Sequence, residues 1–269
     1  MTNLALGERR PAILPAIEAA IRRRRFWFRF QYAAVWGVLI GFLLLVLWLT
    51  DNLDIPWIAE WGPFIVGGAW TTILVCVVSM VLATSLAVIG SIARLSRSAI
   101  ASGVSGLYVS LVRGTPLLVQ IYFMYLALPQ VGIRLDALHA GILALGFNYG
   151  AYMTEIFRAG IQAVPRAQRE AAESLGMPER TVMRRVVLPQ AVRIVIPAIG
   201  NDFVAMIKDS ALISAISVGE LLWRANAVGN RNFRTLQALL IAAAIYWALT
   251  IIFSFFQERL ERRMARGDR

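Results

Sequence analysis

The chain consists of long apolar runs joined by polar connections. Crossing about 30 Å of hydrocarbon takes about 20 helical residues, and six runs are long enough: residues 32–50, 64–92, 104–128, 137–157, 194–217 and 236–256. Each backbone amide in a bilayer needs a partner within its own segment, which favours helices, and the alternating pattern of a barrel strand is absent. The pattern therefore predicts an all-α integral membrane protein with about six transmembrane helices.

Basic residues indicate the orientation of these helices, because positively charged connections stay in the cytoplasm. Arginines are concentrated before the first run, between residues 158 and 193, and after residue 257, whereas the 51–63 connection holds three acidic residues and no basic one. The Glu220–Arg234 connection, which this orientation places outside, is mixed because it also holds Arg224 and Arg231. We expect a multi-pass protein with both termini in the cytoplasm.

Composition narrows the class of function. Of the 269 residues 58% are hydrophobic and only 16% charged, against about a quarter charged in soluble domains. The net charge of +11 fits attraction to membrane lipids better than nucleic acid, since no recognition helix or aromatic-basic strand accompanies it. With one cysteine, Cys76, and one histidine, His139, there is no metal spacing and little for hydrolytic chemistry. We expect no metal, cofactor or catalytic residue in this chain.

The connection between residues 158 and 193 is predicted to be helical. Pro165 suits the first turn of a helix, residues 166–175 are good helix formers, and Gly176 suits a left-handed C-terminal position. Pro178 opens a second stretch over residues 179–188, which we expect Pro189 to end just before the membrane.

The first of these helices carries two adjacent alanines, Ala171 and Ala172, which would let another backbone approach closely. Such a helix could insert into a groove on a partner, and a large side chain at Ala172 would then hold the two apart. Alternatively, the hairpin is solvated and touches nothing. The residues by themselves leave both interpretations open.

The spacing of this connection resembles a known pattern. The matching residues are Glu170-Ala171-Ala172, then Gly176, then Val186-Val187-Leu188-Pro189. They are similar to the EAA loop of binding-protein-dependent ABC importers, with Val186 in place of isoleucine. Residues 112–120, 151–161 and 208–212 resemble the polar amino-acid branch of that family. The resemblance extends from about residue 61 to the C-terminus.

The resemblance implies a type I ABC importer-like permease with a cytoplasmic coupling helix, in the bacterial inner membrane. Its implied partners are a cytoplasmic ABC ATPase dimer, a second permease subunit (identical or different) and an extracytoplasmic binding protein. Six residues would couple the chain to the ATPase: Glu170, Ala171, Ala172, Gly176, Leu188 and Pro189. ATP would be bound by the partner, since this sequence lacks a GxxxxGK[ST] phosphate loop.

The implied function is translocation of polar or charged amino acids across the cytoplasmic membrane. A permease for opines or related small solutes, or a secondary transporter, is the alternative. Residues 1–30 would be a basic cytoplasmic segment, either with a short surface helix over residues 16–25 or as a loose tail. Residues 31–60 would be an additional first helix and outer loop. Residues 61–257 would be the permease core, with its EAA-like loop at residues 165–189, and residues 258–269 a basic tail.

Polar groups at membrane depth are costly and indicate a candidate substrate path. Lys208 and Asp209 lie roughly 22 Å from the cytoplasmic end of their run, where they either line the path or form a structural ion-pair network. Asn148, Tyr152 and Glu155 share one helix face. Asn148 is a substrate candidate or a polar helix–helix contact, and Glu155 is expected to pair with Arg158.

Arg113-Gly114-Thr115-Pro116 is another candidate part of the path. Glycine and proline together can interrupt a helix and free backbone groups where the path runs. Arg113 would attract a carboxylate or pair with another helix, and Gln120 would lie two turns further along the same face.

Reporter fusions test the expected topology. A fusion at Asp54 should report the outer side and one at Arg97 the cytoplasm, because the first lies in the acidic connection and the second follows Arg94 in a basic one. Fusions that report the same side would contradict this arrangement of spans.

Overall fold

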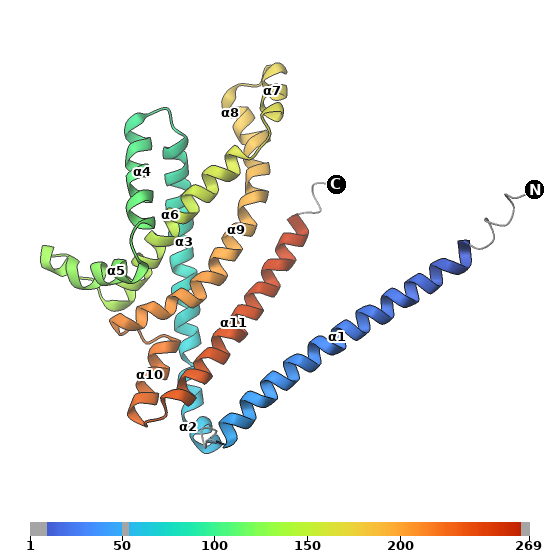
Figure 1. Cartoon of the computed structure of the whole chain (residues 1–269). Helices are drawn as coiled ribbons and strands as arrows, with labels where there is room; N and C mark the ends of the chain where they lie inside the picture. The colour runs from blue at the N-terminus through green and yellow to red at the C-terminus, as the bar shows by residue number, and fades with distance from the viewer. Residues whose placement is uncertain (1–9, 50–53, 265–269) are drawn as a thin grey trace, which may run out of the picture. The chain divides into compact units, whose positions relative to one another are not determined.

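The computed structural model describes residues 10–49 and 54–264, which form helices and their connections without a strand. The chain divides into two units, Met1–Ile55 and Pro56–Arg269. The first unit contains one described helix, α1 (Arg10–Leu49), drawn in blue in Figure 1. This helix passes the boundary expected at residue 30 without interruption, so residues 16–25 are helical and continue directly into the first apolar run.

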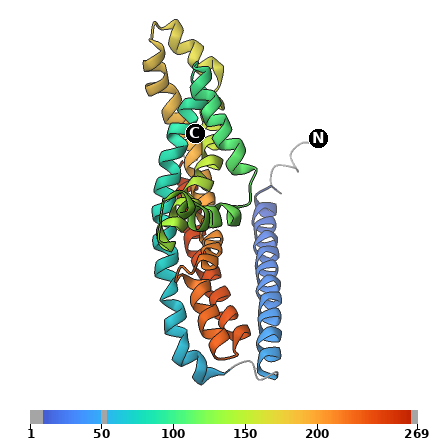
Figure 2. The same cartoon turned by 90° about the vertical axis from the view of Figure 1, so that its left-hand side faces the viewer.

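The second unit is a bundle of helices (Figures 1 and 2). Its α-helices are α2 (Ile55–Val66), α3 (Gly68–Leu95), α4 (Ala99–Arg113), α5 (Leu117–Tyr122), α6 (Ala137–Gln162), α7 (Arg166–Ser174), α8 (Glu179–Val182), α9 (Leu188–Asp209), α10 (Leu221–Arg231) and α11 (Thr235–Met264). Short π or 3₁₀ segments extend some of them: η1 (Phe123–Ala127), η2 (Leu128–Val131), η3 (Met183–Val187) and η4 (Ser210–Ile216).

By length and composition, four helices among the described residues are candidate membrane spans and a bent pair makes a fifth, against about six predicted from the sequence. Four are continuous: Ile17–Val46, Ile55–Leu95, Glu179–Ile216 and Thr235–Met264. The expected run 104–128 is not one straight helix, because α4 and the helical segment that begins at Leu117 are bent by 106° and make a fifth span only as a pair. α6 covers the expected run 137–157 but is not among these candidate spans, and twelve of its 26 residues are buried against the chain.

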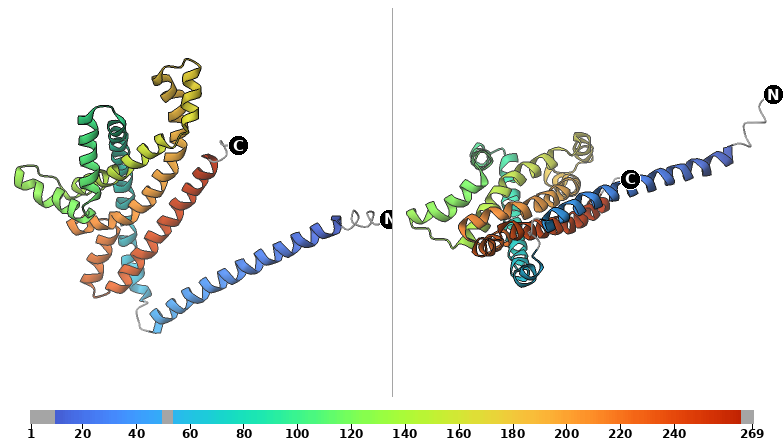
Figure 3. Two further views of the ribbon diagram at one scale, coloured as in Figure 1. Left: turned by 45° about the horizontal axis from the view of Figure 1, so that its top comes forward. Right: turned by 60° about the horizontal axis from the view of Figure 1, so that its bottom comes forward.

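The bundle is held together by close helix contacts around α6. α6 packs against α3 and crosses it at an angle (Figure 1), while α9 and α11 lie side by side (Figures 1 and 3). Helices in a bilayer gain little from the hydrophobic effect, so close approach depends on small residues. Gly90 of α3 lies against Thr154 of α6, and Gly146 of α6 lies against Leu82 of α3, with no room for a further side chain.

Pro189 does not end a helix, contrary to the sequence-based expectation. The π segment η3 precedes it, and the chain is continuously helical from Glu179 through α9. In a regular helix the proline ring would clash with the carbonyl four residues earlier. The wider π turn, in which the Leu188 N–H donates to the Met183 carbonyl oxygen, relieves that clash.

Acidic side chains cap two of the helices. Asp136 accepts from the backbone N–H of His139 at 2.9 Å at the start of α6, and this hydrogen bond lowers the pKa of the Asp136 carboxyl. Glu220 accepts from the N–H groups of Leu222 (3.0 Å) and Trp223 (2.7 Å) at the start of α10. Each cap supplies an acceptor to backbone donors that have no partner within their helix.

Gly146→Val should destabilise the bundle. A Cβ at position 146 would lie 2.5 Å from Cδ2 and 3.1 Å from Cβ of Leu82, and such overpacking costs about 1–3 kcal/mol. Gly103→Ala in α4 is the matched control, because nothing lies within 4 Å of its added Cβ. Thermal unfolding of the purified protein measures both. An equal melting temperature for Gly146→Val and the wild type would contradict the tight α3–α6 contact.

Candidate functional site

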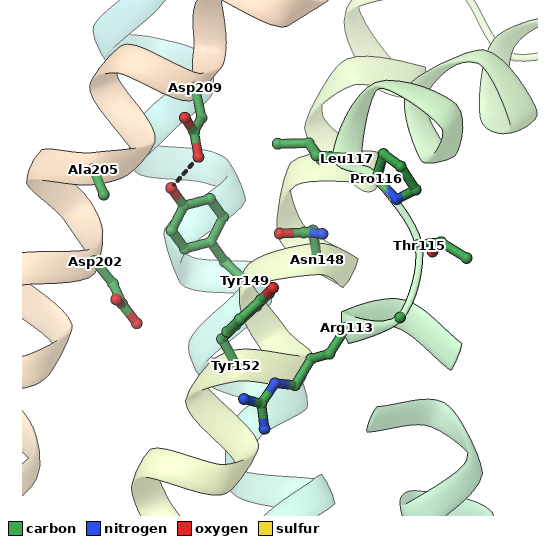
Figure 4. A pocket seen from close by; sticks show the side chains of 11 residues that line it. Arg113, Thr115, Pro116, Leu117, Asn148, Tyr149, Tyr152, Asp202, Ala205 and Asp209 are labelled. Atoms are coloured by element: carbon green, nitrogen blue, oxygen red, sulfur yellow. Dashed lines mark hydrogen bonds between the residues drawn. The ribbon is translucent and has the colours of Figure 1, made fainter. Parts of the chain in front are cut away.

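A cavity of about 570 Å³ lies where the α4–α5 break, α6 and α9 meet. Figure 4 shows α9 on one side of it, the break on the other, and α6 between them. Of the seven residues predicted to form the substrate path, five line this cavity: Arg113, Thr115, Asn148, Tyr152 and Asp209. Gln120 and Lys208 do not line it, but Gln120 is hydrogen-bonded to Asn148, which does.

Two side chains donate hydrogen bonds to backbone carbonyl oxygens at the break between α4 and α5. Gln120 Nε2 donates to the carbonyl oxygens of Val112 (2.7 Å) and Thr115 (3.1 Å), and the Thr115 hydroxyl donates to that of Leu111 (3.0 Å). These carbonyls would otherwise lack a partner in hydrocarbon, at a cost of roughly several kcal/mol each. Because the chain bends between them, Gln120 does not share a face with Arg113 as the sequence suggested.

The break also positions Asn148. This side chain is buried, with 7% of its surface exposed, and its Nδ2 donates to Gln120 Oε1 at 3.2 Å. Figure 4 shows the amide oxygen turned toward the cavity. The hydrogen bond to Gln120 therefore orients the amide so that it presents an acceptor to a molecule in the cavity.

Arg113 brings a positive charge to the same cavity. Its guanidinium carbon lies 5.0 Å from the centroid of the Tyr152 ring (Figure 4). A guanidinium stacked on a ring gains a cation–π interaction and keeps its N–H donors in the plane where a carboxylate can meet two of them.

Two carboxyl groups on α9 line the cavity. Asp202 and Asp209 are seven residues apart, close to two helical turns, and so share a face. Asp209 accepts from the Tyr149 hydroxyl at 2.7 Å. Oδ2 of Asp202 is shielded from solvent and has no hydrogen-bond partner in the described part of the chain. A buried carboxylate oxygen without a partner is costly, which makes Asp202 the group best placed to accept a hydrogen bond from a ligand.

Sequence reasoning did not single out Asp202, although its spacing from Asp209 was a usable signal. Lys208 was singled out, but it is exposed on another face of α9. Adjacent helical residues point about 100° apart, so only one of the Lys208–Asp209 pair faces the cavity.

Glu155 lies one turn beyond Tyr152 on α6. Its carboxylate pairs with Nη2 of Arg158 at 2.7 Å, as predicted, and with Nε of Arg94 at 3.2 Å. The second pair joins the end of α3 to α6 beside the cavity.

The connection between α6 and α9 forms a hairpin of α7 and α8, here called the α7–α8 hairpin (residues 165–187). Gly176 has φ +77°, which confirms the predicted left-handed position. The Met177 N–H donates to the Ala172 carbonyl oxygen at 3.2 Å and the Gly176 N–H donates to that of Glu173 at 2.9 Å. This pair of hydrogen bonds is the Schellman motif that ends helices with a left-handed glycine.

The two alanines of the hairpin face different ways. Ala172, with 5% of its surface exposed, packs against Val164, Val182 and Val187 inside the hairpin. A large side chain at this position would therefore disrupt the hairpin itself. The exposed set is Ala171, Leu175 (83% exposed) and the other expected coupling residues, Glu170, Gly176, Leu188 and Pro189.

Residues 86–266 match the family described as "Binding-protein-dependent transport system inner membrane component". The chain belongs to this family. It is similar to the L-cystine transport system permease protein TcyB of Bacillus subtilis, with 38% identity over 81% of this chain and 95% of the relative. It is also similar to the arginine transport system permease protein ArtQ of the same organism, with 35% identity over 81% of this chain and all of the relative.

Among solved structures, the permease is similar to a chain of an amino acid ABC transporter with histidines. The two share 36% identity and a TM-score of 0.76, over 78% of this permease and 99% of that chain. The protein is therefore a multi-pass inner-membrane permease subunit of an ABC transporter, a transport component rather than an enzyme. Membership in this family implies an ATPase and a binding protein as partners, and the ATPase handles ATP.

Ala172→Leu should loosen the α7–α8 hairpin, because the added atoms enter a filled core at a cost of about 1–3 kcal/mol. Limited proteolysis of the purified permease should then cleave the hairpin faster. Ala171→Leu, on the exposed side of the same turn, is the matched control and should leave the cleavage rate unchanged. Equal resistance of the two variants would contradict the packing of Ala172.

Proposed function

We propose that this permease imports polar or charged amino acids and that the cavity between the α4–α5 break, α6 and α9 holds the substrate on its path. Two similar permeases are named for L-cystine and arginine, and the similar solved transporter is described with histidines. These names support amino acids as the class of substrate.

The observation that carries the proposal is the arrangement of charge around the cavity. Arg113 is suited to a carboxylate and Asp202, on the facing helix, to an ammonium group. Asn148 lines the same cavity and has both donors and acceptors. A zwitterionic amino acid carries the complementary groups. Because Asp202 and Asp209 face one guanidinium, a cationic side chain fits this cavity better than an anionic one.

The remaining parts of the importer follow from the same assignment. The α7–α8 hairpin lies at the opposite end of the second unit from the α10–α11 turn (Figure 1), which supports a cytoplasmic hairpin and an outward-facing turn. Glu170, Ala171 and Leu175 would contact the ATPase, while Ala172 and Gly176 shape the hairpin. Both termini would be cytoplasmic, and a second permease subunit, identical or different, would complete the translocation path.

Substitutions in the cavity test this function in the complete transporter reconstituted in vesicles. Asn148→Ala should lower amino-acid uptake about five- to tenfold, because a lost hydrogen bond to a buried group costs about 1–1.5 kcal/mol. Asp202→Asn should lower uptake of arginine, lysine and glutamine alike, because each presents the ammonium group assigned to Asp202. Asn201→Ala is the control, since Asn201 bonds Gln257 at 2.6 Å instead of lining the cavity.

Protein abundance in the vesicles is measured beside uptake. Normal uptake and unchanged substrate preference in both cavity variants, at normal abundance, would show that this cavity does not hold the substrate. If the transporter takes up an opine and none of the tested amino acids, the proposed class of substrate is wrong, but the cavity remains the proposed binding site.

A further inference from the structure

The connection between α9 and α11, which the proposed orientation places outside, is unusually basic. Outer connections normally hold few arginines, yet this one holds Arg224, Arg231 and Arg234. Its one carboxylate, Glu220, is fully buried as the cap of α10 and gives the surface no counter-charge. Arg224 has a role inside the fold, where it donates to the Phe64 carbonyl oxygen at 3.1 Å. Arg231 is exposed in the last turn of α10.

The turn after α10 also holds an aromatic residue in a conformation that favours glycine. The Arg234 N–H donates to the Gly229 carbonyl oxygen at 2.8 Å. This bond ends α10 in the same way that the bond from the Met177 N–H to the Ala172 carbonyl oxygen ends α7. In α7 the left-handed position is occupied by Gly176, whereas in α10 it is occupied by Phe233, with φ +56°. Bulky residues rarely adopt this conformation, because the Cβ crowds the backbone. Phe233 is also 94% exposed, so packing within the chain does not explain it.

We propose that the turn of residues 230–234 is the contact of this subunit with the extracytoplasmic binding protein, and that Phe233 inserts into an apolar depression edged by carboxylates. The proposal rests on the orientation and function proposed above. A permease that depends on a binding protein must receive it on the outer side, and Figure 1 places this turn at the end of the second unit away from the α7–α8 hairpin.

The backbone conformation favours a protein partner over lipid. A ring that only anchors a helix in lipid needs no special backbone, and the exposed Trp70 stands in the regular helix α3. A left-handed residue that holds an exposed ring in one place suits a partner of defined shape, where a single aromatic side chain can dominate the affinity. Arg231 beside it supplies the charge that makes acidic edges complementary.

Photo-crosslinking in cells that contain the whole transporter identifies the partner. Benzoylphenylalanine in place of Phe233 should give a light-dependent adduct that mass spectrometry identifies as an extracytoplasmic solute-binding protein. The same group in place of Trp70 should give none. Because no transported solute has to be known, this result is independent of the amino-acid assignment. If benzoylphenylalanine at position 233 crosslinks only to lipid, the proposal is overturned.

The crosslinked binding protein is then titrated against the transporter in nanodiscs, with ATP hydrolysis as the readout. Phe233→Gly removes the ring and the unfavourable conformation, so the melting temperature and the basal hydrolysis should not fall. The half-saturating concentration of binding protein should rise at least about tenfold, and Arg231→Glu should raise it most at low salt. Trp70→Ala is the control and should leave it unchanged. An unchanged half-saturating concentration for Phe233→Gly would overturn the proposal.

Discussion

The arrangement of the cavity depends on the need to satisfy backbone hydrogen bonds where a helix is broken inside a membrane. No water is available in hydrocarbon to replace a lost helical partner. Thr115 at the break and Gln120 in α5 replace those partners, reaching back to the carbonyls of Leu111 and Val112. Gln120 can reach Val112 only in one orientation, which leaves its oxygen to accept from Asn148. The hydrogen bonds that permit the break therefore also orient the amide that faces the cavity.

A continuous helix joins the other side of the cavity to the α7–α8 hairpin. The chain is helical from Glu179 to Ile216, because the π turn before Pro189 accommodates the proline without a break. Asp202 and Asp209 are part of this helix, whereas Arg113 belongs to α4. A force applied at the hairpin can therefore reach the two carboxyl groups through a rigid element, and would change their separation from the guanidinium that faces them.

The sequence was most informative where local chemistry decides the structure. Gly176 takes the left-handed conformation because only glycine does so without crowding, and glycine and proline break the third apolar run where expected. Errors arose where tertiary packing decides. Ala171 and Ala172 look equivalent in sequence, but only the structure shows which one lies inside the hairpin. The expected position of Gln120 assumed a straight helix through the break.

The family resemblance recovered the class of protein, but it did not rank the polar residues of the cavity. An ionised side chain at the bilayer centre costs about 2.5–3.5 kcal/mol, which drew attention to Lys208 and Asp209 but not to Asp202. The structure distinguishes the charged residues of the cavity by the partners that each already has. Asp209 accepts from Tyr149, Arg113 stacks on Tyr152, and Asp202 has an oxygen without a partner among the described residues.

Among the described residues that line the cavity, Asp202 has a shielded oxygen without a hydrogen-bond partner, and Arg113 has a guanidinium placed over the Tyr152 ring. These groups stand on α9 and α4, two helices that each pack against α6. A zwitterion bound between them would add a direct link between α4 and α9, because its ends carry opposite charges and each end satisfies one group. Its binding free energy would favour the separation of the two helices that matches its own length. The substrate would therefore stabilise one arrangement of the helices over others, by the difference in its affinity for them.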